Sequence, residues 1–215
     1  VYVGATPEAA RTACDAERAM IAACDRGEPV TVALNAALGR ALGYPECCIA
    51  AFGPRCDLPN AALRFAALRQ TGAVAFALLN DVDPRRALIS HFVCRYDCGA
   101  SLRYAQGVLD AVAAVDAPRA EALSQSLHGV VALFREGGAL QLGETRAADA
   151  ERYAYRSTVG HGNLGENAHW RDVLADADEV RLARGELTPF RKGQALAPLA
   201  FDETRVQIRP FVGAA

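Results

Sequence analysis

The sequence predicts an α+β protein, with a mostly helical N-terminal part that carries a cysteine site and a small C-terminal part with antiparallel strands. Up to about residue 128, apolar residues recur every three or four positions between helix-start and helix-stop signals. After Gly129, apolar and polar residues alternate in short runs separated by turns, which is typical of half-buried strands. We therefore divide the chain into a helical cysteine-site domain, residues 1–128, and a small α+β domain, residues 129–215.

The first two predicted helices begin at hydroxyl-bearing residues. Thr6 is followed by a proline and a glutamate, which suit the first turn of a helix and its positive dipole end. This helix is expected over residues 7–26, with a glycine at its end. Thr31 is expected to cap a second helix over residues 32–42, which also ends at a glycine.

A third helix is predicted where the sequence reads Leu-Gly-Tyr-Pro-Glu-Cys-Cys, residues 42–48. A proline at the first helical position with a glutamate behind it is a helix-start signal. Cys47 and Cys48 therefore fall in the first turn, where the dipole and the backbone N–H groups favour thiolates. A loop over 53–59 and a helix over 61–70, capped by an asparagine, follow.

The next stretch mixes short apolar runs with turns. Residues 73–79 are apolar, residues 80–84 form a turn-rich break, and residues 87–93 are either a short strand or the tail of a helix. Asp97 is predicted to cap a long helix to about Val115, with a cysteine at its first helical position. One more helix, from Pro118 to about Leu127, completes the helical part.

The C-terminal part is predicted as strands around one helix. A hairpin is expected because two alternating apolar runs flank a Glu-Gly-Gly turn. The glycine-rich stretch around His161 lacks a phosphate-loop lysine and follows no clear strand, so we interpret it as a loop. The predicted segments are strands at 130–134, 139–142, 152–159, 179–183 and 204–209, and a helix at 163–175.

Four of the seven cysteines form the predicted site, which joins Cys47 and Cys48 to Cys94 and Cys98. Because adjacent side chains diverge, we expect the pair at 47–48 to add one ligand and rarely two. Three thiolates from two helix N-termini suit a [4Fe-4S] cluster with one open iron, whose negative charge the backbone N–H groups stabilise. Zinc, with His91 as a fourth ligand, and metal-free buried or redox thiols remain open alternatives.

The other three cysteines have weaker interpretations. Cys14 and Cys24 lie on one helix, about 15 Å apart at 1.5 Å per residue, so they cannot bind one ion together and are expected to be small core residues. Cys56 lies on the loop after the Cys47/Cys48 helix. It is either an additional ligand, a resolving thiol or incidental.

Several polar residues lie close to these cysteines in the sequence. Arginines can bind an anionic substrate through forked hydrogen bonds, and tyrosine or histidine can donate protons. The ordinary alternatives are solvated arginines and packed aromatic rings. We predict substrate binding by Arg85, Arg86, Arg95 and Arg103, and catalytic roles for Tyr44, Tyr96 and His91.

The two cysteine motifs resemble an uncharacterised prokaryotic family whose members share an LGYPxCC element and a later Cys-x3-Cys element. The resemblance covers roughly residues 38–105. It implies that Cys47 or Cys48 acts together with Cys94 and Cys98. It implies no substrate.

Composition limits the class of protein. The net charge is −2, and no basic stripe or apolar run of about 20 residues occurs, so we expect neither nucleic acid nor a membrane as a partner. An odd number of cysteines, two of them adjacent, argues against a secreted disulfide framework and favours the cytoplasm. The leading prediction is an iron–sulfur enzyme, a lyase, sulfur-transfer or redox catalyst, acting on a small anionic or sulfur-containing substrate, with a possible partner enzyme or electron donor. The alternatives are a structural zinc or scaffold protein and a metal-free thiol redox protein.

Overall fold

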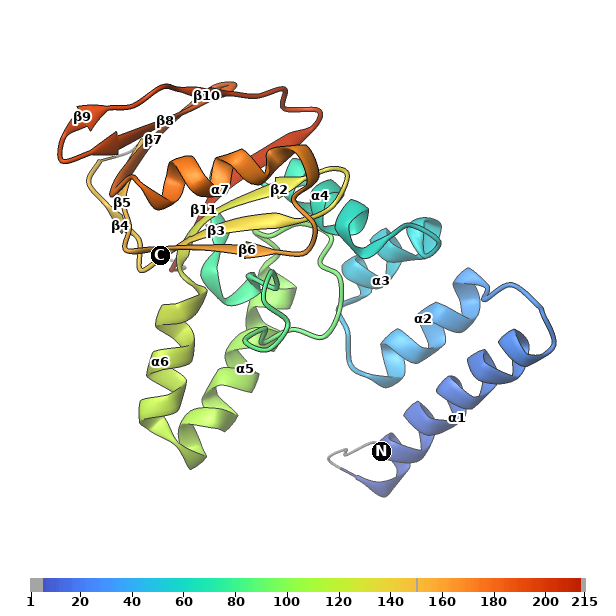
Figure 1. Ribbon diagram of the computed structural model, residues 1–215. Coiled ribbons are helices and arrows are strands. Elements are labelled where there is room, and N and C mark those ends of the chain that lie inside the picture. Colours follow the sequence, from blue (N-terminus) through green and yellow to red (C-terminus); the bar gives the residue numbers. More distant parts are fainter. Residues whose placement is uncertain (1–5, 150, 214–215) are drawn as a thin grey trace. The chain divides into compact units, whose positions relative to one another are not determined.

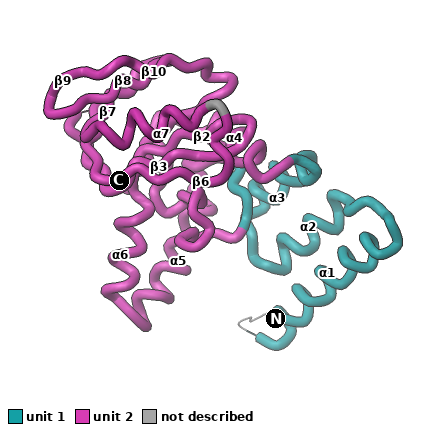
Figure 2. The backbone as a smooth tube through the Cα atoms, in the orientation of Figure 1, with its two compact units in different colours: residues 1–58, 91–94 teal, residues 59–90, 95–215 magenta. Residues whose placement is uncertain are grey.

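The computed structural model describes residues 6–149 and 151–213 and confirms the α+β class (Figure 1). Helices dominate the first part of the chain and strands the second. The chain folds into two compact units (Figure 2): unit 1 comprises residues 1–58 and 91–94, and unit 2 comprises residues 59–90 and 95–215. This division differs from the predicted domains 1–128 and 129–215, which stay a prediction.

Within its described residues, unit 1 contains three α-helices, and the first two begin as predicted. The hydroxyl of Thr6 accepts a hydrogen bond from the Ala9 N–H, and that of Thr31 accepts one from the Leu34 N–H. Each bond satisfies one of the N–H groups that a helix leaves exposed at its start. These helices, which pack against each other, are α1 (Pro7–Asp25) and α2 (Val32–Ala41).

The third helix begins one residue later than the proline signal implied. Pro45 is its N-cap, with extended backbone, and the helix is α3 (Glu46–Phe52). The predicted loop at 53–59 begins instead with a 3-10 turn, η1 (Gly53–Arg55), which directly follows α3. Cys47 and Cys48 lie in the first turn of α3, as predicted.

In the part of unit 2 that the structure describes there are four α-helices and two 3-10 turns, and the helices differ from the predictions mainly at their starts. Pro59, not Asn60, is the N-cap of α4, and no side chain caps that helix. Cys98, not Asp97, is the N-cap of α5, because the Asp97 carboxylate instead accepts the Gly72 N–H. The elements are α4 (Asn60–Gln70), η2 (Ala77–Leu79), α5 (Gly99–Val115), α6 (Ala117–Leu127), η3 (Gly165–Asn167) and α7 (Ala168–Ala175).

Two predicted segments take other forms. Residues 87–93 are neither strand nor helix but irregular backbone. The helix expected at 163–175 begins only at Ala168, because Gly165 adopts a φ of 51° and its N–H donates to the Asn163 side chain. This local turn ends in η3 before the regular helix starts.

Two sheets lie in unit 2. The first runs in the order β1 (Ala75–Phe76), β11 (Val206–Val212), β2 (Gly129–Phe134), β3 (Ala139–Gly143) and β6 (Ser157–His161), with only β1–β11 parallel. The second runs in the order β10 (Leu199–Ala200), β8 (Glu186–Arg191), β7 (Glu179–Ala183), β5 (Arg152–Ala154) and β4 (Arg146–Ala147), and β9 (Gln194–Ala195) pairs with β8. The predicted hairpin at 130–142 is confirmed as β2 and β3.

The strand predicted at 152–159 is divided between the two sheets. Residues 152–154 pair with β7 in the second sheet, whereas residues 157–161 pair with β3 in the first. Between them, the Tyr155 N–H donates to the Asp178 carbonyl and the Arg156 N–H to the Gly143 carbonyl. The chain therefore changes sheet within two residues, which a continuous alternating pattern does not reveal.

One core joins the two sheets and α7. Trp170 of α7 meets the ring of Phe134 from the first sheet at 5.7 Å and that of Phe201 at 6.0 Å. All six residues of β2 are buried, because α4 packs on β2 as well. None of the helices in the described part of the chain is long and apolar enough to cross a bilayer.

Candidate metal centre

Four thiols converge in the structure. The sulfur atoms of Cys47, Cys48, Cys94 and Cys98 all lie within 4.8 Å of one another. The first two come from the opening turn of α3, Cys94 from the irregular segment after residue 90, and Cys98 from the N-cap of α5. The chain therefore holds a compact four-cysteine cluster that could bind a metal.

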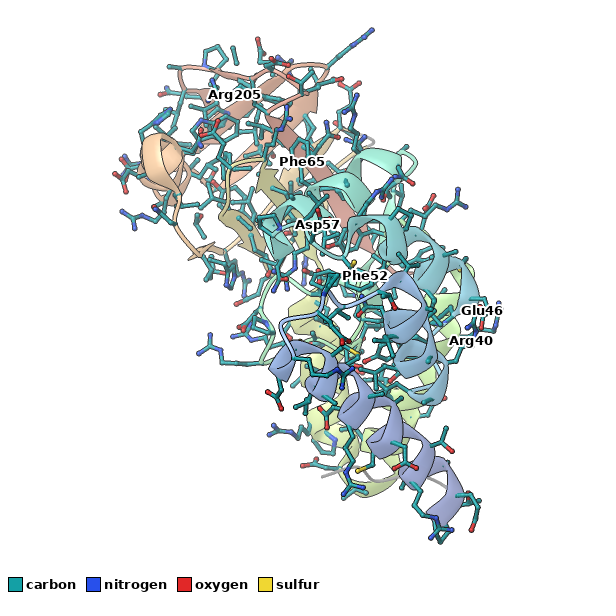
Figure 3. All side chains as sticks on the ribbon, turned by 90° about the vertical axis from the view of Figure 1, so that its right-hand side faces the viewer. Arg40, Glu46, Phe52, Asp57, Phe65 and Arg205 are labelled. Atoms are coloured by element: carbon teal, nitrogen blue, oxygen red, sulfur yellow. The ribbon has the colours of Figure 1, made fainter. Side chains whose placement is uncertain are left out.

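Hydrogen bonds connect α2 to the opening turn of α3 and to the residues just before it. The Arg40 guanidinium binds the Glu46 carboxylate through two hydrogen bonds, of 2.8 and 3.2 Å (Figure 3). The Tyr44 N–H donates to the Gly39 carbonyl, and this hydrogen bond closes the turn that follows α2. Glu46 directly precedes the two cysteines, so these contacts connect α2 to the turn that carries both thiols, although the exposed ion pair contributes little to stability.

The expectation that adjacent cysteines diverge is wrong here. The sulfurs of Cys47 and Cys48 are 3.9 Å apart, and both belong to the cluster. Successive helical residues are separated by about 100° around the axis, which still allows two short side chains to turn toward the same point. The pair thus offers two ligands, and the cluster has four thiols instead of three.

The Cys48 sulfur also links the two segments that form the cluster. It accepts a hydrogen bond from the Cys94 N–H at 3.4 Å. An N–H donor stabilises the thiolate over the thiol, so this contact favours the form that binds metals. Cys48 and Cys94, which are 46 positions apart in the sequence, are therefore connected by a hydrogen bond to the Cys48 sulfur.

Burial differs among the four thiols. Cys48 and Cys98 are only 2% and 5% exposed, Cys94 is half-buried, and Cys47 is exposed. Cys56 lies outside the cluster, so of its open interpretations the additional ligand is not supported. Cys14 and Cys24 also lie outside it, and the expectation that Cys24 is a core residue is wrong, because its side chain is exposed. No disulfide joins any of the seven cysteines, all of which are described.

His91 and Tyr44 lie together in unit 1, but His91 is not among the clustered ligands. Their rings are 4.8 Å apart at an angle of 35°, and His91 is buried. Next to them, the rings of Phe92 and Phe52 stack at 5.8 Å. In the described residues, the fourth donor is a second cysteine at 47–48 and not His91. Catalytic roles for His91 and Tyr44 stay predictions.

Tyr96 belongs to a buried network that the sequence analysis missed. Its hydroxyl donates to the Asp81 carboxylate at 2.6 Å, and the Arg64 guanidinium donates to the same carboxylate at 2.8 Å. The Tyr96 N–H donates to the Thr71 hydroxyl, and the Tyr96 carbonyl accepts a hydrogen bond from the Phe76 N–H. Asp81 lies in a stretch that the sequence identified only as a turn, so no local signal indicated this network.

This network predicts a specific loss of stability in alkali. Burial, followed by the negative charge of Asp81, holds the pKa of Tyr96 well above its usual value near 10. A folded-state pKa above the unfolded one gives stability that is complete below about pH 10 and is lost as the pH rises above it. We expect the free energy of unfolding, measured in urea, to fall more steeply above pH 10 in the wild type than in Tyr96→Phe.

The comparison between these two proteins isolates Tyr96. Burial also raises the pKa of Tyr155, but that residue is present in both proteins and its contribution cancels. Equal slopes above pH 10 would contradict the assignment.

The four arginines predicted to bind substrate lie in three places. Arg85 and Arg86 pair with the buried Asp83 carboxylate, at 3.0 and 3.5 Å. Arg95 pairs with Asp97 at 3.0 Å, and Arg103 is exposed in the first turns of α5. Their role in substrate binding stays a prediction.

No protein-family model, curated protein or solved structure matches this chain. The family resemblance over residues 38–105 therefore stays a prediction.

Proposed function

We propose that the chain is a metalloprotein in which Cys47, Cys48, Cys94 and Cys98 bind a single zinc ion. The spacing of the sulfurs is the observation that supports this. Zinc–sulfur bonds of about 2.3 Å in a tetrahedron separate the sulfurs by about 3.8 Å. The two adjacent sulfurs are 3.9 Å apart, and all four lie within 4.8 Å of one another, so small side-chain movements suffice.

The type and number of donors also favour zinc. Thiolates are soft ligands, which select zinc, copper(I) or iron over magnesium and calcium. Four thiolates form a closed site, as in structural zinc centres. Four thiolates and one divalent ion leave two negative charges, which the Cys94 N–H and the positive end of α5 at Cys98 stabilise.

In this proposal the ion is structural. It links the start of α3 to the segment 94–98, which is far from α3 in the sequence. Because an unfolded chain has no preformed site, the free energy of metal binding contributes to folding. The metal therefore replaces hydrophobic packing that a short helix such as α3 cannot provide by itself.

An iron–sulfur cluster is the second candidate, and one observation favours it. Three of the thiols are buried or half-buried, whereas Cys47 is exposed. Cys47 is the ligand that a substrate could replace most easily, which would leave three cysteines and an open iron, as predicted from the sequence. A four-iron cluster, however, takes each thiolate at a separate iron and so needs the sulfurs farther apart than a single ion does.

Metal analysis distinguishes these candidates. We expect protein expressed with zinc and iron and purified without oxygen to be colourless and to contain one zinc per chain without acid-labile sulfide. Replacement of zinc by cobalt should give the strong charge-transfer and visible bands of tetrahedral cobalt thiolate. A chelator should then lower the melting temperature.

Two other results are informative. A brown protein with iron and sulfide in equal amounts would support the iron–sulfur candidate and overturn the zinc proposal. Protein without metal after both zinc and iron reconstitution would overturn both candidates. The thiols would then be metal-free, and their reduction potential would become the quantity to measure.

A further inference from the structure

A cavity of about 480 Å³ is lined only by residues of unit 2, and none of the four clustered cysteines lines it. Its size is within the usual range for small-molecule sites, about 300–1,000 Å³. Residues from α4, from the turn at 82–85, from the β2–β3 hairpin and from the end of β6 line it. The proposed zinc site uses none of these residues.

Positively charged groups gather around this cavity. Arg64 and Arg85 line it, and Arg86 reaches the same carboxylate as Arg85. The carboxylates of Asp81 and Asp83 pair with these arginines, but three guanidinium groups outnumber the two acids. Arginine forks match the geometry of phosphate and carboxylate oxygens. A small anion would therefore meet a net positive charge.

The start of α4 adds a second source of positive potential. Its first residues, Asn60 and Ala61, line the cavity, and no side chain caps the helix. The first N–H groups of an 11-residue helix and its dipole favour an anion at that end. Two independent features, the arginines and the helix start, thus favour the same sign of charge.

Two glycines, Gly138 and Gly162, also line the cavity. Gly138 and Gly162 have φ values of 76° and 70°, in the left-handed region that glycine adopts without strain. A Cβ at Gly138 would lie 2.6 Å from the Asn163 carbonyl oxygen, and one at Gly162 would lie 3.3 Å from the Gly138 Cα. The hairpin turn and the loop after β6 therefore pack closely only because both residues are glycine, and this packing places His161 at the cavity.

We propose that this cavity binds a small molecule through a phosphate or carboxylate group, which Arg64, Arg85 and the start of α4 would hold, with His161 beside it. The glycine-rich stretch that the sequence identified only as a loop thus supplies one wall of a site. Of the predicted substrate-binding residues, Arg85 lines this cavity, and Arg86 pairs with Asp83, which also lines it.

His161 provides a direct readout. Burial lowers its pKa, the Asp83 carboxylate raises it, and Arg85, Arg86 and Arg64 lower it further. The imidazole is therefore mostly neutral near pH 7. A bound oxyanion adds negative charge next to the ring, so the pKa of His161 should rise on binding.

The test uses inorganic phosphate and, in a separate titration, succinate. Each is added to the full chain while the His161 ring signals are followed by NMR, and the titration is repeated across pH 5–8. We expect saturable shifts of the His161 signals and a raised His161 pKa in the bound form. The anion that reaches half-saturation at the lower concentration identifies the preferred group, phosphate or carboxylate. Absence of a saturable shift with both anions would overturn the proposal.

Two variants locate the site. Arg85→Ala should weaken anion binding about tenfold, the effect of one lost hydrogen bond to a charged group, whereas Arg119→Ala, which removes an exposed arginine of α6, should not. Ala61→Glu places a carboxylate in the first turn of α4, where it suits the helix dipole, so the fold should keep its stability while binding is lost. Equal weakening by Arg85→Ala and Arg119→Ala would show general charge screening and contradict the site. These outcomes are independent of the metal content.

Discussion

Replacing Cys48 with alanine is expected to abolish tight zinc binding at the proposed site and to destabilise the fold more than any other single cysteine substitution. The Cys48 sulfur is buried, lies 3.9 Å from that of Cys47 and accepts the Cys94 N–H. Structural zinc sites provide roughly 10–16 kcal/mol of apparent binding free energy, so one of four ligands accounts for about 3 kcal/mol. The measurements are zinc per chain after dialysis and the urea midpoint with zinc present.

Two other cysteines provide matched controls. Cys24→Ala changes an exposed thiol on α1, and Cys56→Ala changes one that lies outside the cluster. Both variants should retain one zinc per chain and the wild-type midpoint. If Cys48→Ala also binds a full equivalent with unchanged affinity, the four-thiolate site is wrong.

Substitution of the exposed thiol, Cys47, should have a smaller effect on zinc binding than substitution of the buried Cys48. Cys47 should be the ligand whose loss costs least, because water can occupy its position at the surface. We therefore expect Cys47→Ser to bind zinc more weakly than the wild type but more strongly than Cys48→Ala. The opposite order would indicate that the buried thiol is a packing group.

Replacing Asp81 with alanine is expected to destabilise the fold strongly, although no metal-binding thiol is touched. Its carboxylate accepts the Tyr96 hydroxyl and pairs with Arg64, whose side chain is only 26% exposed. Breaking a buried ion pair by removing one partner typically costs about 3–5 kcal/mol. The partial exposure of Arg64 favours the lower end, so we expect a loss of about 3 kcal/mol in the free energy of unfolding, measured in urea.

A conservative variant separates the contribution of the Tyr96 hydrogen bond from that of the ion pair with Arg64. Asp81→Asn keeps an acceptor for the Tyr96 hydroxyl and removes only the charge that pairs with Arg64, so its cost should be smaller. Asp110→Ala changes an exposed acid on α5 and should remain within about 0.5 kcal/mol of the wild type. A loss below about 1 kcal/mol for Asp81→Ala would show that the network contributes little.

Some elements were predictable because their signals are local. A hydroxyl cap before α1 and another before α2, and the Gly-Gly turn between β2 and β3, each depend on a few adjacent residues. The same is true of the placement of Cys47 in the first turn of α3. Propensity and capping act over one or two turns, so they can be read from neighbouring residues.

Other features could not be predicted because distant residues decide them. The alternating run at 152–159 changes sheet at Tyr155, since β3 and β7 compete for its backbone. Asp97 looked like a helix cap, but its carboxylate accepts an N–H from residue 72 instead. In both cases the local pattern is compatible with two structures, and a partner more than ten residues away selects one.

The sequence alone identified four candidate thiols, because two motifs place Cys47, Cys48, Cys94 and Cys98 at or beside helix starts, although it predicted one ligand, and rarely two, from the adjacent pair. Only the tertiary structure decided that all four meet, that Cys56 does not, and that Arg85 faces a cavity with His161. The physical reason is that ligand geometry depends on side-chain direction and on long-range chain packing. Residue types and spacing restrict the possible ligands, but they do not place atoms.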